Sequence, residues 1–516
     1  MKHQRREFLA NIGGGMFVAS IGSTLAIELG LTTARACEAE SPLNFGQLEP
    51  LVSLMQDTPI ASIQRVLVDR IGKGVSLQEL VIAGALANAR SFGGQDYNGY
   101  HTFMALAPAL EMSKQLPTAE RALPILKVLY RNTNRIQEHG GRKSEVLHEL
   151  HVEEPVGPRP DGPALQAAAR RADFNEAEGV FVRIASGPAN EAFNHLQFAI
   201  QDEVDVHRTV LAWRSWKMTE IAGEAHAHTL LRQSVRYCVD AEQSMKSKGR
   251  SPSGIRELLP TLLDNHGLLH RKPGGRTASD VELQELSQIV FTGSRDQAAR
   301  AVASALAEGM SIESVGEVLS LAANHLLLFD PGRTEQQSSV DKPKGSVHGA
   351  SVGVHACDSA NAWRNIARVS DARNQFASLI VGAYHTAGQS GQSGSKELAY
   401  AEAAEALSIP DENLLLQLDE AIRGKDQLAA SALAYRYLKG NRDPAQAFQT
   451  LLQFAVSEEG ALHAEKFYRT VLEEFEMTRP SLRWRHVVAL ARVSASEYGF
   501  PAAGLTEAKQ LLQLRS

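Results

Sequence analysis

The sequence predicts an all-α protein, organised as a multi-helix array of helical hairpins with irregular internal repeats. Three observations predict this fold class. Apolar residues recur three and four positions apart in long stretches, for example 118–137, 411–422 and 464–477, as they do on the buried face of a helix. Alternation of apolar and polar residues between turn signals, which is typical of strands, is scarce. Proline and glycine stand between the periodic stretches, so they separate helices instead of interrupting them.

A recurring turn justifies the hairpins. Three segments share the order helix, glycine, helix-capping residue, helix, and they are 66–89, 301–324 and 431–456. Their glycines suit the left-handed position that ends a helix, and are Gly74, Gly309 and Gly440. Their capping residues can accept hydrogen bonds from the free amides of the next helix, and are Ser76, Ser311 and Asp443. Either the segments are true internal repeats, or an α-protein has reused one kind of cap.

Composition divides the chain into four parts. A leader occupies 1–36, a main helical domain 37–385, a Gly/Ser-rich linker 386–397 and a C-terminal helical unit 398–516. The linker, TAGQSGQSGSKE, has little apolar surface to bury. We expect the C-terminal unit to pack on the main domain.

The leader carries an export signal. Two arginines are followed by a Phe-Leu pair and a weakly apolar, glycine-rich run, and these four residues are Arg5, Arg6, Phe8 and Leu9. The pattern resembles a bacterial twin-arginine (Tat) signal, with cleavage after Ala36. The resemblance implies that the Tat translocase delivers the protein, already folded, to the periplasm or cell envelope of a bacterium. A Sec signal and lipidation of Cys37 are the alternatives.

The remaining composition disfavours several classes of function. The net charge of −6 offers no basic surface for nucleic acid or anionic lipid. No apolar run after the leader reaches membrane-spanning length. No GxSxG, P-loop or dinucleotide-binding glycine pattern follows a predicted strand, so a serine esterase, an NTPase and a nucleotide cofactor are not expected. Two internal cysteines, Cys238 and Cys357, either form a disulfide in an oxidising compartment or remain buried thiols.

Histidines recur at predicted helix starts. In four regions a glycine precedes a histidine that opens a helix, and a carboxylate lies nearby. These histidines are His101, His226, His228, His348, His355 and His463. The partial positive charge of a helix N-terminus disfavours imidazolium, so a histidine there keeps a lone pair that can bind a metal. If the hairpins stack about one axis, these helix starts face one cavity.

A transition metal ion, namely iron, copper or zinc, is the cofactor that such a histidine set predicts. The primary candidates for its ligands are His101, His228, His355 and His463. Their alternative role is helix capping or buried hydrogen bonding. His195 and His207 flank another predicted helix, and they either reach the same cavity or lie at the surface. Zincin and ferritin-like sites are not indicated, because the sequence has no HExxH motif and no paired ExxH motif.

Two stretches resemble a known family. They are GSVHGASVGVHACDSANAWRNI, residues 345–366, and GYHTFMALAPAL, residues 99–110. Both resemble the questin-oxidase-like proteins, helical oxygenases in which histidines head helices around the expected active site. The resemblance implies oxidation of a small organic substrate, with His348 and His355 near the chemistry.

The histidine set and the export signal together predict an exported, metal-dependent oxidoreductase that acts on a small organic substrate. Loading the ion before export would protect the site from periplasmic copper or zinc, which bind such ligands more tightly than most other divalent ions. A non-catalytic helical-repeat protein that binds a partner in the cell envelope is one alternative. A metal-assisted hydrolase, in which the ion activates water, is the other.

Overall fold

The computed structural model describes residues 37–151 and 158–514, and it confirms the all-α prediction. In these ranges it has 23 α-helices, with 72% of residues helical and 3% in strands. The strands are β1 (Cys37–Pro42) and β2 (His148–His151), which pair antiparallel. The predicted Tat signal, with Arg5, Arg6, Phe8 and Leu9, and the cleavage after Ala36 lie outside the described residues.

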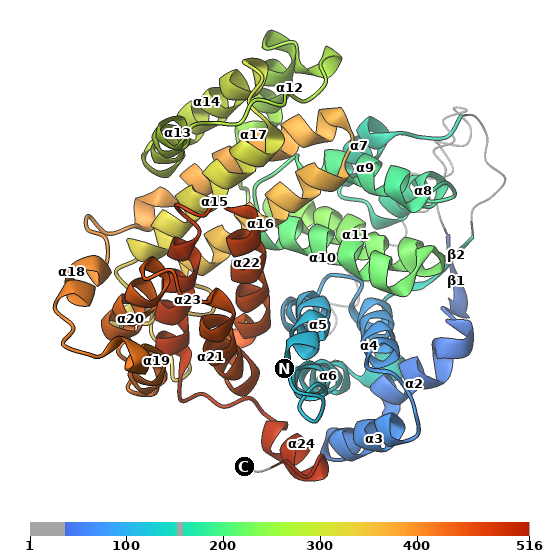
Figure 1. Ribbon diagram of the computed structural model, residues 1–516. Coiled ribbons are helices and arrows are strands. Elements are labelled where there is room, and N and C mark those ends of the chain that lie inside the picture. The colour runs from blue at the N-terminus through green and yellow to red at the C-terminus, as the bar shows by residue number, and fades with distance from the viewer. Residues whose placement is uncertain (1–36, 152–157, 515–516) are drawn as a thin grey trace, which may run out of the picture.

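The helices follow one another in four groups along the colour ramp of Figure 1. The blue group is α2 (Glu49–Asp57), α3 (Ile60–Gly72), α4 (Leu77–Phe92), α5 (Tyr97–Gln115) and α6 (Leu123–Glu138). The green group is α7 (Gly162–Arg171), α8 (Phe174–Ile184), α9 (Ala189–Ile200), α10 (Val206–Ala222) and α11 (Ala227–Ser247). The yellow group is α12 (Ile255–Asn265), α13 (Asp280–Thr292), α14 (Arg295–Ala307), α15 (Ile312–Leu328), α16 (Val352–Val369) and α17 (Ala372–Ala387). The orange to red group is α18 (Tyr400–Glu405), α19 (Leu414–Arg423), α20 (Gln427–Lys439), α21 (Pro444–Ser457), α22 (Ala464–Met477), α23 (Trp484–Glu497) and α24 (Leu505–Leu511).

Four helices, one from each group, form the middle of the molecule. α5 packs on α10 and α22, and α16 packs on the same two helices, so the four close a ring. Figure 1 shows α12 to α14, α18 to α20 and α2 to α3 at the periphery around them. Each central helix is buried along most of its length, and α10 and α22 bury charged side chains as well as apolar ones.

The recurring turn is present at all three predicted places. Before α4 and α15 the glycines have φ of +94° and +84°, and serine hydroxyls accept from the backbone amides of Glu79 and Ser314. The third turn differs, because Gly440 has φ −75° and the left-handed residue is Asn441, with φ +54°. Asparagine tolerates this conformation better than most residues do. Asp443 caps the following helix, as predicted.

The predicted linker is tied to the helices that precede it. The backbone amides of Gly394 and Leu398 donate to the carbonyls of Phe329 and Leu328, at 2.7 and 2.9 Å. The C-terminal helices pack on the rest of the chain at several places: α22 on α5 and α16, α23 on α15, and α24 on α3 and α6. The division at 386–397 stays a prediction.

Two further questions from the sequence concern cysteines and membranes. Cys238 and Cys357 are both buried and both free. Burial raises the pKa of the Cys238 thiol to about 11, so this thiol is protonated and inert at neutral pH. None of the helices in the described ranges is long and apolar enough to cross a bilayer.

Candidate functional site

Four histidines from the four central helices meet at one point, and we call them the histidine ring. They are His101, His207, His355 and His463. The ring centroids lie 4.8 Å apart for His101 and His207, and 5.4 Å apart for His207 and His355. The circuit closes through His463, at 5.0 Å from His355 and 5.2 Å from His101. Helices far apart in sequence therefore aim their first turns at one centre.

Helix caps place these first turns. Asp96 caps α5 by accepting from the amide of Gly99 at 2.7 Å. Asp205 caps α10 and accepts from the amides of His207 and Arg208, and Ser351 caps α16. These short polar side chains are strong N-cap formers, so the sequence itself fixes where three of the four helices begin.

The fourth helix, α22, begins after a strained turn. Gly460, Ala461 and Leu462 have φ of +56°, +46° and +72° in succession. The left-handed region costs a non-glycine residue about 1–3 kcal/mol, and such residues are concentrated at functional sites. The turn presents the carbonyl of Ala461 to His463, whose Nδ1 donates to it at 2.8 Å. Strain is therefore accepted at the place that orients one imidazole.

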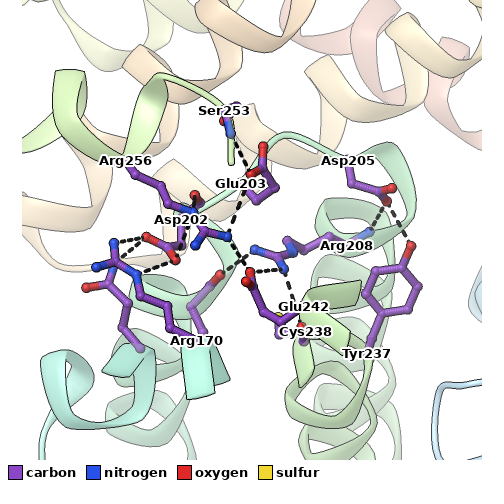
Figure 2. Close-up of polar contacts among 12 residues, drawn as sticks. Arg170, Asp202, Glu203, Asp205, Arg208, Tyr237, Cys238, Glu242, Ser253 and Arg256 are labelled. Carbon is purple, nitrogen blue, oxygen red and sulfur yellow. Dashed lines mark hydrogen bonds and ion pairs between the residues drawn. The ribbon is translucent and has the colours of Figure 1, made fainter. Parts of the chain in front are cut away.

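A charged network anchors the start of α10, as Figure 2 shows. Asp205 also accepts from the hydroxyl of Tyr237, at 2.9 Å. Arg208 pairs with Glu242 at 3.4 Å, and Glu242 also binds Arg256. The network continues through Asp202 and Arg170, which pair on its far side. These ion pairs and hydrogen bonds fix the first turn of α10, and they therefore fix the position of His207.

Hydrogen bonds set the tautomer of two of the imidazoles. His101 Nδ1 donates to the carbonyl of Tyr97 at 2.7 Å, as His463 Nδ1 does to Ala461. Their Nε2 atoms therefore carry lone pairs that point into the ring. The Nε2 atoms of His101 and His207 are buried and have no hydrogen-bond partner among the described residues. A backbone carbonyl on one nitrogen and a free lone pair on the other is the arrangement of metal-binding histidines.

Burial keeps all four imidazoles neutral. It lowers the pKa of His207 to about 4, and it lowers the pKa values of His101, His355 and His463 well below the ordinary 6.5. The positive charge of Lys466 acts in the same direction on each of them. Neutral imidazole is the form that binds a metal ion.

Tyrosines line one side of the histidine ring. The rings of Tyr97 and Tyr100 lie 4.3 and 5.0 Å from that of His101, and Tyr237 lies 5.5 Å from Tyr100. Tyr100 is buried, whereas Tyr97 is 49% exposed. The site therefore has an aromatic wall that reaches from its centre to solvent.

A second polar layer lies along the same helices, deeper in the bundle. Lys466 follows His463 by about one turn of α22, and Asp358 follows His355 by about one turn of α16. Arg214 lies about two turns beyond His207 on α10. Burial lowers the pKa of Lys466 to about 7 and raises that of Asp358, which accepts from the hydroxyl of Thr470 at 2.8 Å.

The donor chemistry fits a transition metal ion, and the distances fit in part. Two imidazole nitrogens bound to one ion at about 2.0–2.1 Å lie roughly 3.0–3.4 Å apart. His355 Nε2 and His463 Nε2 are 3.0 Å apart. In the described part of the chain, no three His, Cys, Asp or Glu side chains are already placed around one ion position. A third ligand would need a rotation of the His101 or His207 side chain toward this pair.

The other predicted ligands lie elsewhere. His226 lies 6.1 Å from the ring of Phe45, and His228 stacks on Phe181 at 5.8 Å. His348 uses both nitrogens, which lie 2.9 Å from the hydroxyl of Ser496 and 2.8 Å from the carbonyl of Asp341. In the part of the chain that the structure describes, none of these three rings contacts the histidine ring.

The antiparallel turn between α10 and α11 explains the position of His228. The chain reverses at Gly223, so α11 begins at the end of α10 that is opposite to His207. Along a helix of this length, the two ends are roughly 25 Å apart. From the sequence, His207 could lie either in the cavity or at the surface. The structure places it in the histidine ring, at the position expected for His228. Lys466, Arg214 and Tyr97 were missed, although their spacing from the histidines places them on the same helix faces. Tyr100 and Tyr237 were missed as well, and no such spacing marks them.

Comparison of the chain with protein-family models, curated proteins and solved structures finds no match. Function is therefore inferred from the geometry of the histidine ring.

Proposed function

We propose that the histidine ring binds one transition metal ion and that the protein is a metal-dependent oxidoreductase acting on a small organic substrate. The observation that supports this most directly is the convergence of four neutral imidazoles, two of which have a buried Nε2 with no partner in the part of the chain that the structure describes. A buried polar atom left unpaired costs about 1–3 kcal/mol, and a bound ion would remove that cost. Iron, copper and zinc all accept imidazole ligands.

The residues that would hold the ion are His101, His207, His355 and His463, each through Nε2. For His355 and His463, the 3.0 Å contact between these atoms has two chemical forms. Without an ion, His355 donates its Nε2 hydrogen to His463, because the Nδ1 hydrogen of His463 is already given to Ala461. With an ion, both atoms carry lone pairs and coordinate it.

Redox chemistry is favoured by what surrounds the histidine ring. When bound, the metal ion would supply electron transfer to or from the substrate. The tyrosine wall of Tyr97 and Tyr100 can orient a flat organic molecule by stacking. The nearby carboxylate of Asp205 already accepts from two backbone amides and from Tyr237, so it is not available as a general base. The likeness to questin-oxidase-like proteins and the Tat-like leader agree with this proposal.

A metal-assisted hydrolase is the second candidate, and Lys466 favours it. A buried amine whose pKa is about 7 can take a proton from water at neutral pH. The inward direction of the histidine ring gives less support to a non-catalytic scaffold, for which an exposed concave surface would be expected.

The test is metal analysis of the full chain expressed with its own leader. Bound metal is measured by mass spectrometry in the wild type and in His101→Asn and His463→Asn. His228→Asn is the matched control, because His228 is also a buried, neutral imidazole but lies outside the histidine ring. We expect both ring variants to lose most of the metal and the control to keep it. Equal metal content in all four proteins would contradict the proposal.

Activity then separates the two enzyme classes. Oxygen consumption with aromatic acids and phenols tests the oxidoreductase, and release of nitrophenolate from nitrophenyl acetate tests the hydrolase. We expect turnover in the first assay, and its loss in the ring variants. Turnover only in the second assay would favour the hydrolase.

A further inference from the structure

Two buried cations have no hydrogen bond or ion pair with any residue that the structure describes. Most buried lysines and arginines in the described part of the chain form hydrogen bonds or ion pairs, and these are Arg90, Lys127, Arg208, Arg232, Arg236, Arg364 and Arg492. The exceptions are Lys466, which is 2% exposed, and Arg214, which is 4% exposed. Neither has a hydrogen bond or an ion pair with any described residue, and Arg214 Nε is fully enclosed.

An unpaired buried charge is costly. Removing a cation from water costs several kcal/mol, which the surrounding protein normally repays with a partner. Lys466 can reduce this cost by losing its proton, and its pKa is lowered to about 7. Arg214 cannot, because a guanidinium stays protonated in proteins. Glu473 and Asp358 act on its charge, but no described residue forms an ion pair with it within 4.0 Å.

Both cations lie beneath the histidine ring. Residues three or seven positions apart share one face of a helix, so Lys466 lies on the same face as His463, and Arg214 on the same face as His207. The two charges are close enough that Arg214 disfavours the protonated form of Lys466. The carboxylate of Asp358 interacts with both, yet it forms no ion pair with either within 4.0 Å. Two other carboxylates act on these cations but are already paired, Glu473 with Arg469 at 2.7 Å and Glu465 with Lys127 at 2.8 Å. Among the described residues, two positive charges therefore share one carboxylate that has no ion pair of its own, which leaves room for one more negative charge.

We propose that the carboxylate of an organic acid binds between Lys466 and Arg214, with the body of the acid beside the histidine ring and the tyrosine wall. This assignment of substrate class rests on the proposed function. A guanidinium binds a carboxylate through two parallel hydrogen bonds, and an ammonium adds a third. A phosphate fits less well, because its second negative charge would approach Asp358. The site thus selects acids with a single charge at this end.

Benzoate is the probe, and benzamide is its neutral analogue of the same shape. Binding to the full-length, metal-loaded protein is measured by calorimetry, together with formate as a free anion that has no ring. We expect benzoate to bind at least about tenfold more tightly than benzamide, because the neutral amide leaves the buried cations without a counter-charge. Benzoate should exceed formate by a similar factor, because formate has no ring to stack on the tyrosine wall. Benzamide binding as tightly as benzoate would overturn the proposal. Formate binding as tightly as benzoate would assign the site to a free anion and would also overturn it.

Variants locate the binding site. Lys466→Met and Arg214→Gln should each weaken benzoate binding by about tenfold or more. Lys217→Met is the matched control, because Lys217 is on the same helix as Arg214 but is bound to Glu220 near the surface. Unchanged benzoate affinity in both site variants would refute the assignment. Metal content is measured in parallel, and benzoate binding that depends on Lys466 and Arg214 in a protein without metal would reject the metal proposal while supporting this one.

Discussion

Two neighbouring residues of α10 face two regions of opposite character. Arg208 lies in the paired network of Figure 2, where Glu242 and two backbone carbonyls bind its guanidinium. His207 lies in the histidine ring, where its Nε2 has no partner among the described residues. The same helix therefore buries a guanidinium that has an ion-pair partner and an imidazole whose Nε2 has no partner among the described residues. The comparison indicates that, in α10, the buried charge that anchors the helix is ion-paired, whereas the imidazole that faces the histidine ring keeps a nitrogen that a ligand could bind.

The largest effect should come from breaking the paired network. Glu242→Gln would remove the carboxylate that binds both Arg208 and Arg256. We expect the free energy of unfolding to fall by about 3–5 kcal/mol, because a buried guanidinium loses its counter-charge. Urea unfolding followed by circular dichroism measures this change. A loss under about 1 kcal/mol would mean that the network contributes little to stability.

The opposite result is expected for the unpaired cation. Lys466→Met removes a buried charge that has no bonded partner, so the free energy of unfolding should stay constant or rise by about 1–4 kcal/mol. Lys127→Met is the matched control, because Lys127 is equally buried but pairs with Glu465 at 2.8 Å. This control should destabilise the protein as strongly as Glu242→Gln does. If both lysine variants lose the same stability in urea, paired and unpaired lysines do not differ as we infer.

Acid should destabilise the protein through its buried imidazoles, inside and outside the histidine ring. His228 lies outside the ring, and burial lowers its pKa from 6.5 to about 4. Between these two pH values the unfolded chain binds a proton that the folded protein does not, so stability falls as the pH falls below 6.5. The loss is up to about 1.4 kcal/mol per pH unit for one such histidine.

His228→Phe should reduce this acid sensitivity, because it removes one of the groups that titrate only in the unfolded chain. Urea midpoints near pH 7 and near pH 5 measure the difference between the variant and the wild type. Between pH 7 and pH 5, the wild type should lose more of its free energy of unfolding than His228→Phe does. Parallel pH dependence would show that His228 is not desolvated in the folded state.

The sequence predicted the helical class and part of the site, and the residues show why. His101 and His355 could be predicted because glycine and a capping residue mark their helix starts, and His463 because Gly460 precedes it. His228 has the same local signal, but sequence spacing does not tell which end of the bundle a helix start reaches. Lys466 and Arg214 could not be singled out, because they differ from the other buried cations only in having no ion-pair partner among the described residues. The sequence does not show which charges become paired. Such partners lie far away in sequence, as Lys127 and Glu465 do.

The smallest effect should come from removing a helix N-cap. Two such variants can show whether a cap only stabilises the protein or also positions a metal ligand. Ser351→Ala removes the cap of α16, which carries His355, and Ser311→Ala removes the cap of α15, which carries no ring histidine. Each should cost about 0.5–2 kcal/mol of stability, because one amide of the first turn loses its acceptor. Only Ser351→Ala should weaken Co²⁺ binding, by about tenfold, because support of a ligand affects metal affinity on this scale. Thermal melts and Co²⁺ titrations measure the two quantities, and equal Co²⁺ affinities in the two variants would show that the start of α16 does not position a ligand.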